Sequence, residues 1–127
     1  MTAQEIFNIV ALHLFNQQAG SFDENYEHCL YRNDDGLKCA IGCLIPDEKY
    51  SEDMEGDSSE NIPFFTVEDL LTFPFMEPYK GHSDLLNALQ DAHDSCSCDP
   101  DEFWDECKPQ LIKVAKKFNL MVPEEIL

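Results

Sequence analysis

The sequence predicts a predominantly helical α+β fold, with about five helices and one small β-hairpin near residues 29–39. Three observations lead to this prediction. Apolar residues recur at helical spacing in several segments, capping residues precede most of these segments, and one turn motif separates two short strand-like stretches. A length of 127 residues fits a single domain, residues 1–127. Nine Phe, four Tyr and one Trp argue against a disordered acidic chain.

The first helix is predicted to begin at a capping box formed by Thr2 and Glu5. Apolar residues then follow at helical spacing until Gly20. The hairpin is predicted next, because residues 29–32 and 37–39 flank a turn rich in Asp that ends in Gly36.

Across this hairpin, Arg32 and Lys38 should lie near each other and near Asp34, Asp35 and Asp47. We expect an ion-pair cluster that holds the hairpin, and the alternative is a ligand site.

A short buried run follows at residues 40–45, where Pro46 limits any helix to one or two turns. Residues 47–60 carry many acidic side chains and predict an exposed loop or a frayed helix. Thr66 and Asp69 then predict a second capped helix, which is short because Pro74 closes it.

The last two helices are predicted from their starts. Ser83 is expected to cap one whose Leu residues face inward, ending near Cys96. Asp99, followed by Pro100, is a strong start signal for the other. The apolar face of this last segment continues past Pro109, which predicts a single kinked helix, with two separate helices as the alternative.

Acidic residues dominate the composition, with 26 Asp and Glu against 8 Lys and Arg and a formal net charge of −18. This exceeds what solubility asks of a small domain. Such a charge repels nucleic acid and attracts basic surfaces, so we expect a protein partner with a basic surface and no direct nucleic-acid contact. Two segments are predicted to make the contact, through Asp47, Glu48, Glu52, Asp53, Glu55, Asp57, Asp101, Glu102, Asp105 and Glu106.

The second of these segments holds like charges four residues apart on one helix, which destabilises it by about 0.2 to 0.5 kcal/mol per pair. This cost favours a functional role, such as inhibition of a partner or mimicry of a phosphate backbone. The alternative is a surface whose charge only keeps the protein in solution.

Six cysteines and no apparent secretory signal predict a reduced protein of the cytoplasm, and no segment has the 18 apolar residues of a membrane span. No cofactor is predicted. The main rival to an acidic binding protein is a small zinc-stabilised module, whose candidate ligands are Cys29, Cys39, Cys43 and Cys96. Against this, reduced thiols pack in protein cores as small hydrophobic groups.

Catalysis is not predicted. His28 beside Cys29, or His93 near Cys96, would be the candidate pairs of base and nucleophile. A dense negative field disfavours the thiolate that such chemistry needs. An enzyme of unrecognised type is therefore the third hypothesis.

One stretch of the chain resembles a family of small uncharacterised proteins of tailed phages and bacteria. The resemblance lies in CLYR from Cys29, GLKCAIGCLIPDEKY from Gly36 and MEG from Met54. It extends to the Leu86 and Trp104 regions and so covers most of the chain. It implies an intracellular and often phage-encoded setting, within the host cytoplasm, and supplies no catalytic residues.

Overall fold

The computed structural model describes residues 1–25 and 28–127. Over these residues the fold is predominantly helical, and most of the regular structure comes from four α-helices. These helices are α1 (Ala3–Gln17), α2 (Val67–Leu70), α3 (Ser83–Asp94) and α4 (Pro100–Lys117). Short 3-10 helices punctuate the connections: η1 (Gly42–Leu44), η2 (Asp47–Lys49), η3 (Glu52–Glu55), η4 (Ser58–Glu60), η5 (Pro74–Tyr79) and η6 (Glu124–Ile126).

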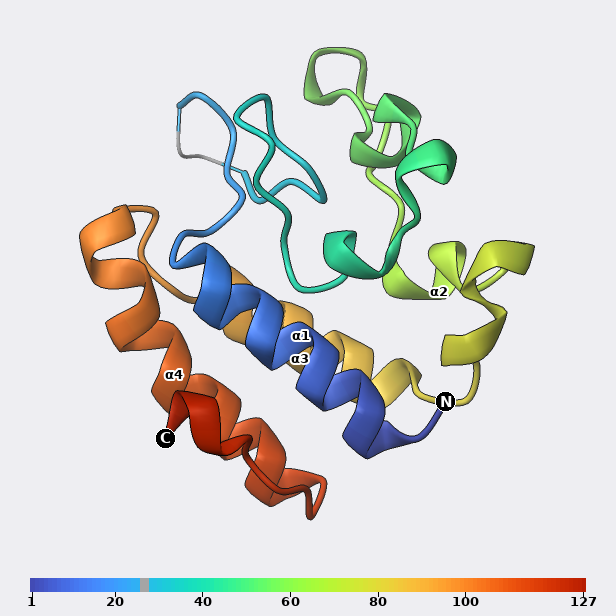
Figure 1. Ribbon diagram of the computed structural model, residues 1–127. Helices are drawn as coiled ribbons and strands as arrows, with labels where there is room; N and C mark the ends of the chain where they lie inside the picture. The colour runs from blue at the N-terminus through green and yellow to red at the C-terminus, as the bar shows by residue number, and fades with distance from the viewer. Residues whose placement is uncertain (26–27) are drawn as a thin grey trace.

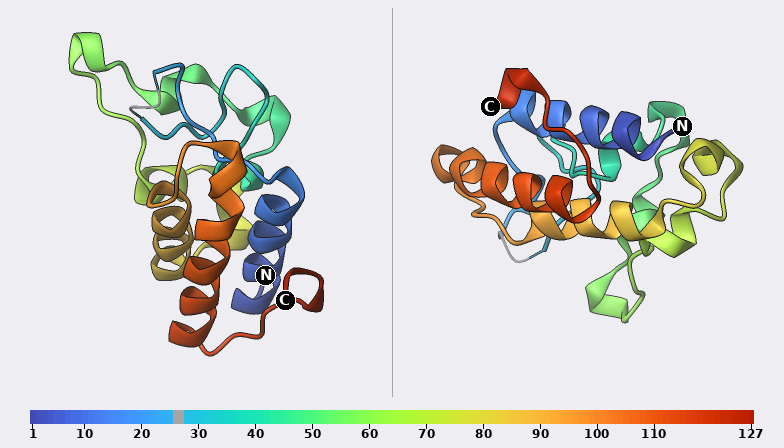
Figure 2. Two further views of the ribbon diagram at one scale, coloured as in Figure 1. Left: turned by 90° about the vertical axis from the view of Figure 1, so that its left-hand side faces the viewer. Right: turned by 90° about the horizontal axis from the view of Figure 1, so that it is seen from below.

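Helices α1, α3 and α4 pack against one another, and the irregular chain before α2 covers one end of this group (Figures 1 and 2). In Figure 1, α1 lies in front of α3 and runs in the same direction, while α4 returns beside them. Fully buried side chains from all three helices form the core, including Phe7, Leu89 and Phe103. None of the helices within the described residues is long and apolar enough to cross a bilayer.

Sequence signals at the helix starts are confirmed. Thr2 and Glu5 form the predicted capping box, Thr66 and Asp69 form the second, and the Asp99 side chain accepts from the Asp101 amide at 3.0 Å. Because each side chain satisfies an N–H that has no partner within the helix, it fixes where the helix begins.

Two further predictions about the helices had different outcomes. The prediction that Ser83 caps α3 was wrong by one position, since the cap is His82 and Ser83 is the first helical residue. Pro109 lies inside α4, which remains one element as predicted.

The predicted β-hairpin near residues 29–39 was wrong, because the structure shows no strand among the described residues. The turn itself forms: the side-chain oxygen of Asn33 accepts from the Asp35 and Leu37 amides. Beyond the turn, Arg32 and Lys38 make only an isolated bridge. Backbone hydrogen bonds from Asn33 to Leu37 and from Cys39 to Tyr31 flank this bridge. The pairing goes no further, because the Tyr31 amide donates to the carboxylate of Glu55 instead of to the Cys39 carbonyl, which accepts from the Cys43 amide.

The C-terminal segment folds back onto α1. The side chain of Gln4 donates to the carbonyl of Met121 and accepts from its amide, both at 2.8 Å. Ile126 of η6 is buried beside this helix. These contacts close the core on the side where α1 meets solvent.

Candidate functional site

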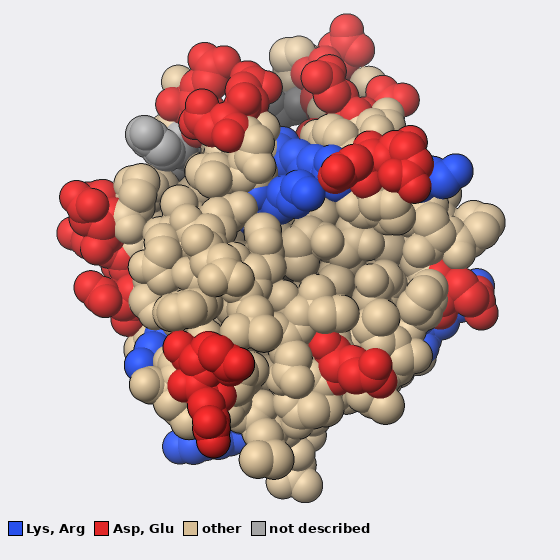
Figure 3. All heavy atoms as spheres, in the orientation of Figure 1, with Lys and Arg blue, Asp and Glu red and all other residues tan. Residues whose placement is uncertain are grey.

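Most of the predicted contact carboxylates are exposed. The acidic segment at residues 47–57 folds as 3-10 helices η2 and η3 and the turn after them, which places Glu48, Glu52, Asp53 and Asp57 on the surface. On the first turns of α4, Asp101, Glu102, Asp105 and Glu106 are exposed as well. In the orientation of Figure 3, acidic side chains crowd the upper edge of the molecule.

Glu55 differs from the other predicted contact residues because its carboxylate is used inside the molecule. One oxygen accepts from the Tyr31 amide and the other from the Arg32 amide, both at 3.0 Å. The Tyr50 hydroxyl donates to the second oxygen at 2.7 Å. Glu55 therefore ties the acidic segment to the Tyr31 loop, and its side chain is not offered to a partner.

Asp47 has a local role that the sequence predicted. Its carboxylate lies 2.8 Å from the Arg32 guanidinium and 3.2 Å from the Lys38 ammonium. These two cations, with Lys38 first, hold the pKa of Asp47 below its usual value. The guanidinium also donates to the Ile45 carbonyl and lies over the Tyr50 ring. The predicted ion-pair cluster is therefore confirmed for Asp47, whereas neither Asp34 nor Asp35 pairs with Arg32 or Lys38 in the part of the chain that the structure describes.

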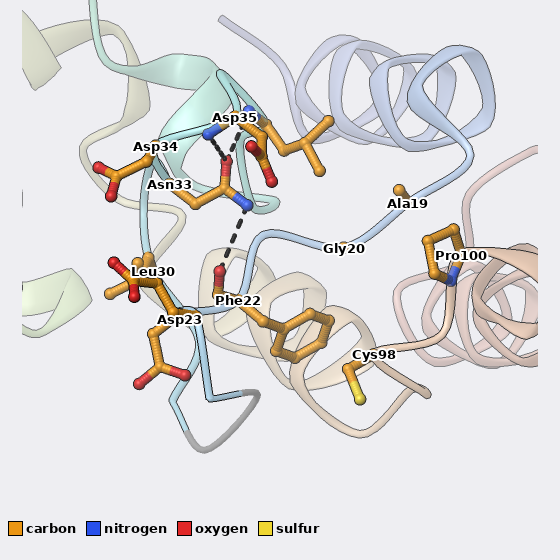
Figure 4. A pocket seen from close by; sticks show the side chains of 12 residues that line it. Ala19, Gly20, Phe22, Asp23, Leu30, Asn33, Asp34, Asp35, Cys98 and Pro100 are labelled. Carbon is orange, nitrogen blue, oxygen red and sulfur yellow. Dashed lines mark hydrogen bonds between the residues drawn. The ribbon is translucent and has the colours of Figure 1, made fainter.

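A hollow of about 470 Å³ opens between residues 19–24, residues 30–37 and the start of α4. Figure 4 shows Asp23, Asp34 and Asp35 around Asn33 on one side, with Cys98 and Pro100 on the other. Asn33 holds this side together by donating to the Phe22 carbonyl at 3.3 Å. The lining includes four carboxylates and neither Lys nor Arg: it comprises Ala19, Gly20, Phe22, Asp23, Glu24, Leu30, Asn33, Asp34, Asp35, Leu37, Cys98 and Pro100.

A second, larger hollow of about 780 Å³ lies among residues 28–31, 55–57 and 61–64. Its wall combines carboxylates with apolar side chains, of which Phe64 is 63% exposed and Ile62 is 50% exposed. The two hollows share Asp23 and Leu30. Acidic and apolar side chains therefore line two neighbouring hollows.

Cys29 and Asp94 line this second hollow, and the buried His93 lies beside them. Their ligand-type atoms all lie within 4.8 Å of one another, and elsewhere in the described part of the chain no other three such groups converge. The ring of His93 is fully buried between Phe22 and Phe103. Helices α3 and α4 and the chain after α1 therefore meet at one imidazole.

Hydrogen bonds fix the state of this imidazole. The Ser21 amide donates to Nε2 of His93 at 3.0 Å, so Nε2 carries no hydrogen and the neutral ring holds its hydrogen on Nδ1. Nδ1 then donates to Asp94 at 2.9 Å, and Gln90 donates to the same carboxylate oxygen at 2.7 Å. His93 thus links the chain after α1 to the end of α3.

The same bonds bear on metal binding and catalysis. A metal ion at Nδ1 would have to displace its hydrogen while Nε2 still faces an N–H donor. For nucleophilic catalysis, both ring nitrogens already have partners, so His93 is not placed to activate Cys29. Burial, reinforced by Asp94, raises the pKa of the Cys29 thiol and disfavours its thiolate. We therefore interpret these three side chains as a structural contact between the chain after α1 and the end of α3.

The other candidate zinc ligands do not join Cys29. Cys39 is buried and its sulfur accepts from the Gly42 amide, while Cys43 and Cys96 donate to the carbonyls of Ala40 and Ala92. Burial raises the pKa of Cys39, and it raises that of Cys43 to about 12. These three thiols pack in or against the apolar core.

His13 gives the fold a dependence on pH. Its Nε2 lies 3.0 Å from the Lys38 carbonyl, and burial holds its pKa below the usual 6.5. As the pH falls below that value, the unfolded chain takes up the proton first, so stability is lost. We expect the urea midpoint to fall between about pH 7 and about pH 5, and to fall less in His13→Gln, whose amide can still donate to Lys38. An equal fall in both proteins would contradict this assignment.

Sequence reasoning missed the residues that shape these hollows. Asp34 and Asp35 were assigned to a turn, which is correct, but their position opposite Cys98 depends on folding. The bond from Ser21 to His93 joins residues 72 positions apart. No local pattern marks either relationship.

No protein-family model, curated protein or solved structure matches this chain. The geometry of its own residues therefore carries the functional argument.

Proposed function

We propose that the chain is a non-enzymatic acidic binding protein, phage-encoded and acting in the host cytoplasm. It occupies a basic or exposed site on a host or phage protein, as an inhibitor or as a decoy for nucleic acid. The observation that carries the proposal is the arrangement of carboxylates around the two hollows that share Asp23 and Leu30, whose linings among the described residues contain neither Lys nor Arg.

The lack of ion pairs at the exposed α4 carboxylates, within the described residues, supports this proposal. In residues 1–25 and 28–127, Lys and Arg side chains pair with Asp47 and Glu77 but with none of the exposed α4 carboxylates. Unpaired carboxylates keep their full attraction for an incoming cation. The α4 start, the acidic segment and the hollows would then form one negative surface toward a partner.

The surroundings of the hollows also favour a binding role over a catalytic one. The hollows offer shape and charge, while the thiol that lines the second one, Cys29, is held in its protonated form by burial and Asp94. Exposed Phe64 adds an apolar contact at the rim of the larger hollow. A combination of apolar and polar contacts is common at protein interfaces.

Affinity purification from host lysate, infected or uninfected, tests the proposal. We expect a partner that is retained at about 0.05 M salt and released at about 0.5 M, because screening weakens attraction between exposed charges. A partner retained equally at both concentrations would contradict a charge-driven contact.

Matched charge variants test where the contact lies. We expect Asp105→Asn with Glu106→Gln to weaken partner binding about tenfold. The control, Glu124→Gln with Glu125→Gln, removes the same net charge at the C-terminus and should bind within about twofold of the wild type. Equal losses in both pairs would mean that only net charge matters, and would overturn the assignment to α4.

A further inference from the structure

Helix α4 carries its charges in two halves of opposite sign. Its first two turns hold four acidic side chains and the rest of the helix holds four lysines: Asp101, Glu102, Asp105, Glu106, Lys108, Lys113, Lys116 and Lys117. These charges cancel, although the whole chain carries a net charge of −18. At the left edge of Figure 3, where α4 lies in Figure 1, acidic side chains stand above basic ones.

The two halves match each other in reverse about Pro109. Three acidic residues before Pro109 have a lysine at the same distance after it, namely Asp101 with Lys117, Glu102 with Lys116 and Asp105 with Lys113. Distances of eight, seven and four residues are close to whole turns of about 3.6 residues, so these side chains share the side of the helix on which Pro109 lies. All of them are exposed. We call these six charged residues and Pro109 the α4 face.

The opposite side of α4 is the one that packs into the molecule. Phe103, Cys107 and Leu111 are buried there, and α1 and α3 lie against this helix. In the left view of Figure 2, α4 lies toward the viewer between α3 and α1. The α4 face is therefore open to solvent.

Within residues 1–25 and 28–127, no ion pair involves a charged side chain of the α4 face. Glu102 accepts from the Ser97 hydroxyl at 3.2 Å, and the Lys117 ammonium lies 5.6 Å from the centre of the Phe118 ring, but both contacts leave the charge uncompensated. The carboxylates of η6 lie elsewhere, because η6 packs against α1, which separates it from α4 in the left view of Figure 2.

We propose that the α4 face is the surface on which two copies of this chain pair. A two-fold axis through Pro109 sets two α4 helices side by side in opposite directions, and residues equally far from Pro109 then face each other. Each acidic side chain of the α4 face meets a lysine of the other copy, and each such ion pair occurs twice. The same symmetry places Glu106 opposite Ile112 and Lys108 opposite Gln110, so no like charges are opposed.

Charge complementarity identifies a second copy as the occupant of this face. A uniformly basic surface would gain from the first half of α4 and be repelled by the lysines of the second half, whereas a second copy presents the reverse order. Exposed Pro109 and half-buried Ile112 supply an apolar centre. At about 0.15 M salt the Debye length is about 8 Å, so repulsion between distant carboxylates of the two copies is largely screened.

Pairing also regulates the proposed function. Asp101, Glu102 and Asp105 belong both to the α4 face and to the residues assigned to a basic partner. A second copy covers them, so a paired chain is closed to the partner at α4. This consequence rests on the proposed function, whereas the pairing is tested with the purified chain alone, so failure of one is distinguishable from failure of the other.

Light scattering coupled to size-exclusion chromatography tests the pairing at about 0.15 M salt, with the full chain loaded at up to about 1 mM. Exposed ion pairs each contribute little, so we expect weak pairing. The mass should rise from one chain of 14.6 kDa toward two as the protein concentration increases. A mass of one chain at every concentration would overturn the proposal.

Charge variants locate the contact. Lys113→Glu with Lys116→Glu makes the α4 face mostly acidic, and Glu102→Lys with Asp105→Lys makes it mostly basic. Either double variant alone should pair at least about tenfold more weakly than the wild type, because like charges then face each other. Mixed in equal amounts, the two should pair at least as strongly as the wild type.

Lys49→Glu with Lys80→Glu is the matched control, since it changes the net charge as much as the acidic variant but lies outside α4. It should pair within about threefold of the wild type. Circular dichroism melts check that each variant is folded, and Lys113→Gln with Lys116→Gln, which should also pair more weakly, replaces an acidic variant that is not. Failure of the mixed variants to pair, or pairing of either one alone as strong as that of the wild type, would refute the assignment to α4.

Discussion

Gly42→Ala is expected to destabilise the protein by about 3 kcal/mol or more, or to prevent folding. A methyl group at this position would collide with the carbonyl oxygen of Tyr31 and lie 2.8 Å from its carbonyl carbon. Both are backbone atoms, so no side chain can turn aside. The same carbonyl accepts from the Cys39 amide at 3.2 Å, and relieving the collision would pull this contact apart. Urea denaturation measures the loss.

Gly36→Ala is the matched control for this prediction. Gly36 has a positive φ of 82°, but a methyl group there meets no atom within 4 Å. Only the backbone conformation is then penalised, at about 1 to 2 kcal/mol. If Gly36→Ala proved as damaging as Gly42→Ala, close packing against Tyr31 would not explain the role of Gly42.

Glu55→Ala is expected to cost about 3 kcal/mol of stability. The substitution leaves the amides of Tyr31 and Arg32, and the Tyr50 hydroxyl, without their acceptor. Glu55→Gln should lose about 1 to 2 kcal/mol, because its NH2 group would face one of the two backbone donors. Thermal or urea denaturation distinguishes these values.

Glu52→Ala provides the control within the same 3-10 helix. Glu52 is exposed, and among the described residues its side chain makes no hydrogen bond, so its loss should change stability by less than about 0.5 kcal/mol. Stability changes of the same size at Glu55 and Glu52 would contradict the internal role of Glu55. Such a result would indicate that the Glu55 side chain belongs to the predicted contact surface.

Helix positions were the most predictable part of this fold. Thr2, Thr66 and Asp99 act within three residues of their own positions, so the sequence holds all the information that a cap needs. The ion pairs among Arg32, Lys38 and Asp47 were also predictable, since few residues separate them.

The hairpin prediction failed for a reason outside its own segment. Residues 29–39 carry the turn and the short flanking stretches of a hairpin, and the turn forms as expected. The carboxylate of Glu55, more than 20 residues away, takes the amides of Tyr31 and Arg32. The local sequence pattern of a segment contains no information about a competing hydrogen-bond acceptor from a later part of the chain.

By itself, the sequence determined the helices, their caps and an excess of negative charge, because these depend on composition and on neighbours along the chain. Tertiary structure alone decided how that charge is used. It set Glu55 inside the molecule, gathered Asp23 and Asp34 around a hollow, and joined Ser21 to His93 across 72 residues. The physical reason is that buried donors must find acceptors wherever packing brings them, and packing is a property of the whole chain.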